Sequence, residues 1–149
     1  MKFLLDTCVI SELANHRPNA QVISWLRRQD PESLYLSFVT VGEIKKGIAK
    51  RGGDARAIAL EKWLQTEILG SFADRILPVE KNVSLEWGRI CGDAERVGRK
   101  RPAVDALIAA TALVHGMKLV TRNIDDMVGM GVPIFNPFCM TRNQSQSEN

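Results

Sequence analysis

Hydrophobic and polar positions follow two alternating patterns along this 149-residue chain. Short apolar runs alternate with longer segments in which apolar side chains recur every three or four positions, as expected for strands separated by helices. The strands are predicted at residues 2–6, 34–38, 76–79, 118–121 and 132–135. Because strands joined by helices run parallel, the pattern predicts an α/β fold with a central parallel sheet of about five strands and helices on both faces.

Local signals predict where the helices begin. The expected first residues are Val9, Pro18, Thr40, Asp54, Val83 and Pro102. Thr40 and Glu43 fit the S/T-x-x-E capping box, and Gly116 stands where a glycine would end the most apolar helix. Residues 1–138 are therefore expected to form one Rossmann-like domain, and the polar residues 139–149 a disordered tail.

The composition indicates a globular protein. Hydrophobic residues make up 45% of the chain and charged residues 25%, and no apolar run approaches the roughly 18 residues of a membrane span. The apolar stretch after Met1 stops at Asp6, too early for a secretory signal. We therefore expect a cytoplasmic protein with no membrane partner.

Histidine and cysteine are poorly placed to bind a metal. Cys8, Cys91 and Cys139 are odd in number and far apart, which excludes a disulfide framework and a zinc-ligand spacing. Only His16 and His115 could supply imidazole. Any metal site must therefore be built from oxygen ligands.

Acidic residues stand at one predicted edge of the sheet. Asp6 ends the first strand, and Asn123, Asp125 and Asp126 follow the fourth. Glu43 and Asp105 lie near the starts of helices. In a parallel α/β fold these positions share the edge where ligands bind.

Each acid also has a purely structural interpretation. Asp6 could cap the helical piece after it, and Glu43 could complete the capping box. Asp105 could interact favourably with the dipole of its helix, and the acids after the fourth strand could simply be polar residues of an exposed loop. Asp105 is the hardest to explain in this way, because its helical neighbours Ile108, Ala109 and Ala112 are apolar and predict a buried face. A buried carboxylate needs a cation, a donor or a proton.

Taken together, the acids predict a metal-dependent hydrolase. Carboxylates gathered at one edge repel one another unless a cation lies among them, and oxygen ligands suit Mg²⁺ or Mn²⁺. Such an ion can activate water for displacement at phosphorus. The chain has a net charge of +3, with two basic groups that are either solvated helix ends or phosphate-binding surfaces: Lys45, Lys46, Lys50 and Arg51, and then Arg96, Arg99, Lys100 and Arg101. Phosphodiester hydrolysis is the leading chemistry.

Four stretches carry a resemblance to a known family. They are "LLDTCVISE", "VTVGEIKKGI", "AVDALIAATALVHGMKLVTRNIDDM" and "VPIFNPF". In combination they resemble a PIN domain, most closely that of the VapC-type toxins of bacterial toxin–antitoxin pairs, over about residues 2 to 138. The resemblance implies a PIN-like fold and a Mg²⁺- or Mn²⁺-dependent endoribonuclease. It also implies a homodimer and a VapB-like antitoxin that obstructs the site, in a heterotetramer or larger complex.

The resemblance also implies roles for individual residues. Asp6, Glu43 and Asp105 match the three main acids of the family, with Asp6 and Asp105 as metal ligands. Asp126 is the predicted fourth acid, although Asn123 stands at a position that is acidic in some relatives. Glu43 would act through a metal-bound water or take a proton from it, and Thr7 resembles the hydroxyl that supports the metal-bound solvent.

The chain departs from the family at Cys8, where relatives usually carry Asn. A thiol forms weaker hydrogen bonds than an amide, so Asp6 would be held less firmly unless Cys8 simply packs as a small buried hydrophobe. This departure keeps an alternative open, a PIN-like module that binds RNA or a partner without cleaving it.

Two other classes of protein fit the sequence less well. A signalling receiver domain needs paired acids after its first strand and a lysine after its fifth, and this chain has neither. A phosphate-ester hydrolase with an Asp nucleophile needs D-x-D-x-T, which "DTCVI" does not supply. For a ribonuclease, single-stranded or loop RNA is the expected substrate class, because its phosphodiesters are accessible to a pocket.

Overall fold

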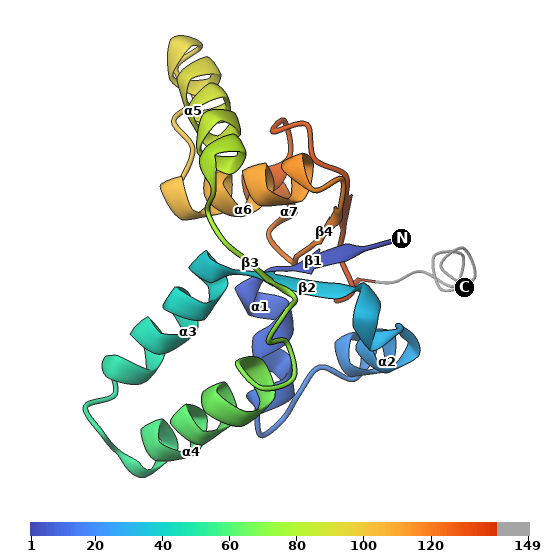
Figure 1. The fold of residues 1–149 in the computed structure, drawn as a ribbon, viewed down its shortest axis with the longest axis vertical. Coiled ribbons are helices and arrows are strands. Elements are labelled where there is room, and N and C mark those ends of the chain that lie inside the picture. Colours follow the sequence, from blue (N-terminus) through green and yellow to red (C-terminus); the bar gives the residue numbers. More distant parts are fainter. Residues whose placement is uncertain (140–149) are drawn as a thin grey trace.

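One parallel sheet lies at the centre of the molecule. The computed structural model describes residues 1–139, so the expected disordered tail lies outside the described residues except for Cys139. The sheet has the strand order β3-β2-β1-β4-β5, and every pairing is parallel. Figure 1 shows its strands crossing the middle of the molecule between two groups of helices. This confirms the predicted α/β class. The strands are β1 (Phe3–Leu5), β2 (Leu34–Ser37), β3 (Ile76–Leu77), β4 (Lys118–Val120) and β5 (Ile134–Phe135).

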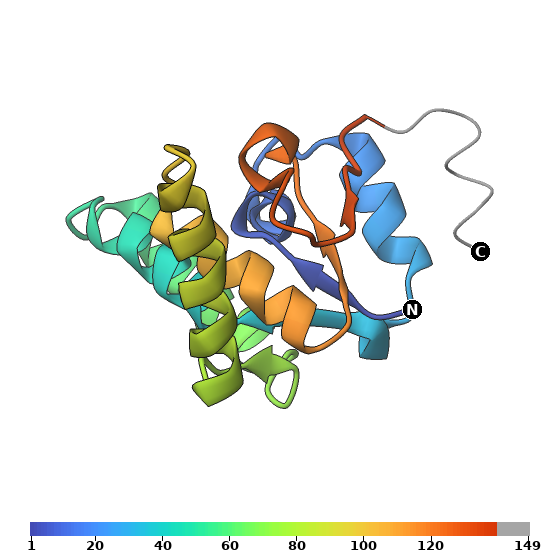
Figure 2. The same cartoon turned by 90° about the horizontal axis from the view of Figure 1, so that it is seen from above.

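Successive strand side chains point into two different cores. Phe3 and Leu5 belong to one core and Leu4 to the other, as the two-residue period of a strand requires. The first core is closed by helices α1 (Thr7–Ile10), α2 (Ala20–Arg28) and α4 (Ala55–Trp63), and the second by α5 (Lys81–Arg96) and α6 (Ala103–Val114) (Figures 1 and 2). Both faces of the sheet are therefore covered, as predicted.

The chain changes direction across the sheet at β1. After β1 it adds β2 and β3 on one side, and then α5 and α6 lead it to the other side for β4 and β5. Leu5 of β1 is in register with Val120 of β4. The carboxyl ends of β1 and β4 therefore lie next to each other, at the position where open α/β sheets bind ligands.

Several helix starts differ from the sequence prediction. The remaining elements are η1 (Ser11–Ala14), η2 (Pro31–Ser33), α3 (Phe38–Ala49), the π-helical turn η3 (Leu64–Ile68) and α7 (Ile124–Met127). Helix α1 begins at Thr7, not Val9, and α5 begins at Lys81, not Val83. Helix α2 begins after Asn19, whose side chain accepts hydrogen bonds from the backbone of Gln21 and Val22, so the helix does not open at Pro18.

The predicted capping box at Thr40 is wrong. Ser37 caps α3, because its side-chain oxygen accepts a hydrogen bond from the backbone N–H of Val39 at 3.1 Å. Phe38, which was expected to end the strand, is the first residue of this helix. Thr40 is fully buried within the helix, and within residues 1–139 its hydroxyl has no hydrogen-bond partner. Glu43 is therefore free of any capping role.

The predicted cap at Gly116 is confirmed. Gly116 has a φ of 65°, a left-handed conformation that favours glycine. The backbone N–H of Gly116 donates to Leu113, and that of Met117 donates to Ala112, so the last carbonyls of α6 are satisfied. Within residues 1–139, no helix is both long and apolar enough to cross a membrane.

Candidate active site

Asp6 is buried at the carboxyl end of β1 and is held from several directions. Only 4% of the residue is exposed. Its Oδ1 accepts a hydrogen bond from the backbone N–H of Thr7 at 2.8 Å, and its backbone N–H donates to Val120 at 2.9 Å. Asp6 is thus the N-cap of α1, as its structural interpretation predicted. The capping bond uses one lone pair of one oxygen, so the carboxylate can still accept further contacts.

Thr121, directly after β4, fixes the second oxygen of Asp6. Its hydroxyl donates to Asp6 Oδ2 at 2.7 Å and accepts a hydrogen bond from the backbone N–H of Asn123 at 3.0 Å. Thr121 is fully buried. Sequence reasoning missed this residue. The available signal was a hydroxyl at the end of the strand that pairs with β1.

Glu43 contacts the same edge of the sheet through Thr7. The hydroxyl of Thr7 donates to Glu43 Oε1 at 2.6 Å. This bond joins the start of α1 to the first turns of α3, and both side chains are half-buried. The predicted proximity of Glu43 and Thr7 to Asp6 is therefore present in the structure.

Asp105 lies where three other carboxylates act on it. Its helical neighbours Ile108, Ala109 and Ala112 are fully buried, while Asp105 itself is half-buried in the first turn of α6. Burial raises the pKa of the Asp105 carboxyl above its ordinary value. The pKa is raised further by nearby negative charges, those of Asp6, Asp126 and Glu43. Within the described residues, the Asp105 side chain has no hydrogen bond or ion pair, so no protein cation offsets this repulsion.

The segment after β4 contributes Asp126 to this group. Asp126 is exposed on α7, and its charge acts on Asp105, whereas neighbouring Asp125 is not among the acids that do so. Arg101 holds this segment, because its guanidinium donates to the backbone carbonyls of Asp126 at 3.4 Å and Val128 at 2.9 Å. Asn123 is exposed and contributes its backbone N–H to Thr121.

Cys8 both packs against the core and lies near the Asp6 carboxylate. It contacts the first hydrophobic core, as expected for a small buried hydrophobe. Its Sγ also lies 3.8 Å from Asp6 Oδ2 and 3.8 Å from the hydroxyl of Thr121. Burial raises the pKa of the thiol, and the charge of Asp6 raises it further, so Cys8 stays neutral at neutral pH.

The four acids, Asp6, Glu43, Asp105 and Asp126, form what we call the acid cluster. They come from the end of β1 and from α3, α6 and α7, which are far apart in the sequence. Their donors are all carboxylate oxygens, the ligand type that Mg²⁺ and Mn²⁺ prefer. Within residues 1–139, no three histidine, cysteine, aspartate or glutamate side chains are placed so that together they could hold a metal ion.

Comparison with known protein families identifies the fold. The family described as "PIN domain" matches residues 3–127. Toxin FitB from Neisseria gonorrhoeae is 37% identical over 135 residues, which cover 91% of this chain and 97% of FitB. VapC ribonuclease Y4jK from Sinorhizobium fredii is 35% identical over 135 residues, covering 91% of this chain and 96% of that relative.

Solved structures show the same arrangement. A chain of the FitAcB complex from Neisseria gonorrhoeae superimposes with a TM-score of 0.86 at 36% identity, covering 93% of this chain and 99% of that one. A chain of VapBC2 from Rickettsia felis bound to a promoter DNA fragment superimposes with a TM-score of 0.70 at 20% identity, covering 91% of this chain and 98% of that one. The second likeness supports the fold alone.

Proposed function

The chain belongs to the PIN domain family, and we propose that it is the toxin ribonuclease of a toxin–antitoxin pair, with the acid cluster as its metal-dependent active site. The observation that carries the proposal is the unbalanced charge at Asp105, which lies among three other carboxylates without a cation from the described residues. The names of the VapC and FitB relatives support the activity.

The acid cluster fits a hard divalent cation such as Mg²⁺ or Mn²⁺. A cation would relieve the repulsion that raises the pKa of Asp105. Asp6 and Asp105 are the proposed ligands. Oδ1 of Asp6 accepts one hydrogen bond, from the backbone N–H of Thr7, and keeps a lone pair for a metal, whereas Oδ2 accepts hydrogen bonds from Thr121 and, at 3.8 Å, from Cys8. Because no three histidine, cysteine, aspartate or glutamate side chains within residues 1–139 are placed to hold an ion together, water would complete the coordination shell around these two carboxylates, as is usual for Mg²⁺.

The residues around the cluster can prepare water for attack on an RNA phosphodiester. A divalent ion held there would make a bound water more acidic and would stabilise negative charge at phosphorus. Glu43 would accept a proton from the attacking water, because Thr7 occupies only one of its two oxygens. The water oxygen forms a bond to phosphorus, the bond to the leaving ribose oxygen breaks, and that oxygen takes a proton from solvent. Thr7 orients Glu43, and Asp126 adds to the negative potential that attracts the ion.

Partners follow from the same relatives. The FitAB structure, which contains a chain 36% identical to this one, holds toxin FitB in a complex with a second protein. We infer that this chain pairs with a VapB-like antitoxin, and that the toxin itself is a homodimer within a heterotetramer or larger complex. Single-stranded or loop RNA is the proposed substrate class.

The proposal is tested with the purified chain, free of antitoxin, and a pool of structured RNAs. Cleavage is expected with Mg²⁺ or Mn²⁺ and not with a chelator. Asp105→Asn removes one charge at almost constant volume and should lower the cleavage rate at least about 100-fold. Asp6→Ala should have a similar effect. Gel electrophoresis of labelled RNA measures the rate, and circular dichroism verifies that each variant is folded.

The matched control is Asp125→Asn, which removes the adjacent acid on α7 and should retain cleavage. Full activity in folded Asp105→Asn protein would contradict the proposed metal site. A parent chain that binds RNA and metal but cleaves no RNA would instead favour the alternative, a PIN-like binding module.

A further inference from the structure

The two basic groups of the sequence have different surroundings in the structure. In the first group, Lys45 forms an ion pair with Glu61 at 2.8 Å and Arg51 forms one with Asp54 at 3.1 Å. Two of its four charges are therefore neutralised within the molecule. This group matches the interpretation of solvated helix ends.

The second group lies at the end of α5 and in the connection to α6, and most of its cations have no ion-pair partner among the described residues. Arg96, Arg99 and Lys100 are exposed, and across residues 1–139 their side chains form no ion pair and no hydrogen bond. Arg101 is half-buried, and its guanidinium binds backbone carbonyls instead of carboxylates. No acid of the described chain neutralises these cations, although Asp126, one acid of the cluster, lies on the adjoining segment.

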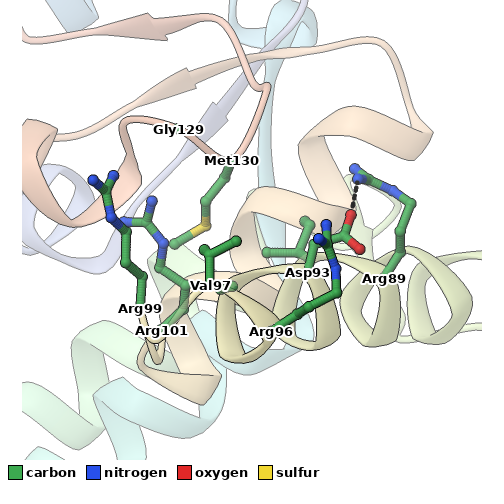
Figure 3. Close-up of a pocket in the computed structure, with 10 residues that line it drawn as sticks. Arg89, Asp93, Arg96, Val97, Arg99, Arg101, Gly129 and Met130 are labelled. Carbon is green, nitrogen blue, oxygen red and sulfur yellow. Dashed lines mark hydrogen bonds and ion pairs between the residues drawn. The ribbon is translucent and has the colours of Figure 1, made fainter.

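These cations line two adjoining cavities. The first, of about 290 Å³, is bordered by Arg96, Arg99 and Arg101 together with Gly129 and Met130. Figure 3 shows the side chains of Arg99 and Arg101 extending towards the segment that carries Gly129. Arg89 lies at the other end, paired with Asp93.

The second cavity connects the cations to α7 and the residues after it, the segment that carries Asp126, one of the four acids of the cluster. It measures about 500 Å³ and is bordered by Arg99, Lys100 and Arg101 on one side and by Asp125 and Val128 on the other. Arg101 hydrogen-bonds to the carbonyl of Asp126 itself. Arg101, which follows Arg99 and Lys100 in the chain, therefore joins the free cations to the segment that provides Asp126.

We propose that Arg96, Arg99 and Lys100 form a phosphate-binding surface, which holds the RNA strand next to the acid cluster. The inference rests on the proposed ribonuclease function. Four carboxylates repel an RNA backbone, so the affinity for RNA has to come from cations near the cluster but not neutralised by it. Guanidinium groups suit this role because they bind phosphate oxygens in a bidentate manner.

The test measures RNA binding without cleavage. Asp105→Asn protein is titrated with a fluorescent oligouridylate over a range of salt concentrations, and the same is done after adding Arg99→Gln and Lys100→Gln. Each lost phosphate contact should weaken binding about fivefold at about 0.1 M salt and reduce the slope of log K against log salt by about 0.7. The matched control adds Arg27→Gln and Arg28→Gln, which remove two exposed charges from α2 on the opposite face of the sheet.

The outcomes separate this inference from the proposed function. Weaker binding and a smaller slope with the Arg99/Lys100 pair, but not with the Arg27/Arg28 pair, support the phosphate surface. Equal effects of the two pairs, or no effect of either, overturn it. The proposal is also overturned if the Arg99/Lys100 pair weakens the binding of a polyglutamate peptide but not that of oligouridylate, because the surface would then bind an acidic protein segment.

Cleavage by the parent chain is measured separately. If the parent cleaves no RNA while the Arg99/Lys100 pair still weakens RNA binding, the ribonuclease proposal fails and the phosphate surface stands. If the parent cleaves RNA and the pair leaves binding unchanged, the phosphate surface fails and the ribonuclease proposal stands.

Discussion

At the scale of single residues, Thr121 provides a hydrogen bond to Asp6 that the sequence did not predict, because Cys8 can bind Asp6 only weakly. Cys8 stands where the family resemblance leads us to expect Asn, and its thiol lies 3.8 Å from Asp6 Oδ2, too far for a strong contact. The hydroxyl of Thr121 donates to the same Asp6 oxygen at 2.7 Å. A short hydrogen bond to a charged group is about twice as strong as a neutral one. We infer that Thr121, more than Cys8, determines how firmly Asp6 is held.

Thr121→Val should therefore destabilise the protein. The change keeps the side-chain shape and removes the donor to a buried carboxylate, so the free energy of unfolding should fall by about 1–3 kcal/mol. Metal affinity should fall about 10-fold to 100-fold, because a residue that orients a ligand is lost. Urea denaturation measures the first effect and calorimetric titration with Mn²⁺ the second.

The matched control is Thr111→Val on α6. Thr111 is also fully buried, but its hydroxyl donates to the carbonyl of Leu107 within its own helix. Its removal should change stability by less than about 0.5 kcal/mol and leave metal affinity unchanged. Equal effects of the two substitutions would contradict a special role for Thr121.

At the scale of elements, the start of α3 decides what Glu43 can do. The capping box would have engaged Glu43 with the backbone near Thr40. Because Ser37 caps the helix three residues earlier, Glu43 lies beyond the first turn and is free to bind Thr7. Because Ser37 and not Thr40 caps α3, the Glu43 carboxylate has no capping role and belongs to the acid cluster.

Ser37 and Thr40 should respond oppositely to loss of their hydroxyls. Ser37→Ala removes the cap of α3 and should lower the free energy of unfolding by about 1 kcal/mol. Thr40→Val replaces a buried hydroxyl that has no partner among the described residues, so stability should be unchanged or rise by about 1 kcal/mol. Chemical denaturation of the two variants measures the difference. A larger loss in Thr40→Val than in Ser37→Ala would show that Thr40 is the cap.

At the scale of the whole molecule, repulsion among the carboxylates of the acid cluster destabilises the folded state when no metal is bound. Its carboxylates come from four separate elements, so only the folded chain brings them together. The unfolded chain keeps these charges apart, and the repulsion is therefore specific to the native state. Binding a cation to the native state alone would offset this cost.

This repulsion predicts how stability depends on pH. The pKa of Asp105 is raised in the folded protein, so the folded chain binds that proton more tightly than the unfolded chain does. In chelator, stability should fall as the pH rises from the ordinary carboxyl value through the raised one. Asp105→Asn should weaken this dependence and raise the melting temperature at neutral pH.

Calorimetric scans across that pH range measure the effect, and added Mg²⁺ provides the control. At a hundredfold excess over its dissociation constant, the ion should stabilise the parent by about 2.7 kcal/mol and stabilise Asp105→Asn far less. A parent chain whose stability rises with pH throughout that window, and which Mg²⁺ does not affect, would contradict the proposed site.

The sequence by itself determined the order of the strands and of the longer helices, and it predicted the edge of the sheet to which the acids belong, but it did not predict the short helix α7. Both predictions depend on local information: the period of apolar side chains identifies strands and helices, and parallel connections bring strand ends to one edge. Asp6, Asp105 and Asp126 could therefore be assigned to that edge from their positions in the chain alone. Glu43 could be placed there as well, but the sequence alone could not exclude that Glu43 completes a capping box with Thr40.

Only the tertiary structure decided which side chains hold these acids. Asp6 and Thr121 are 115 residues apart in sequence, and Thr7 and Glu43 are 36 apart, so neither hydrogen bond leaves a local pattern. The choice between Ser37 and Thr40 as the cap depended on where β2 ends, which is set by its pairing with β1 and β3. Hydrogen bonds between distant segments depend on the register and packing of the whole sheet, and periodicity along the chain does not encode them.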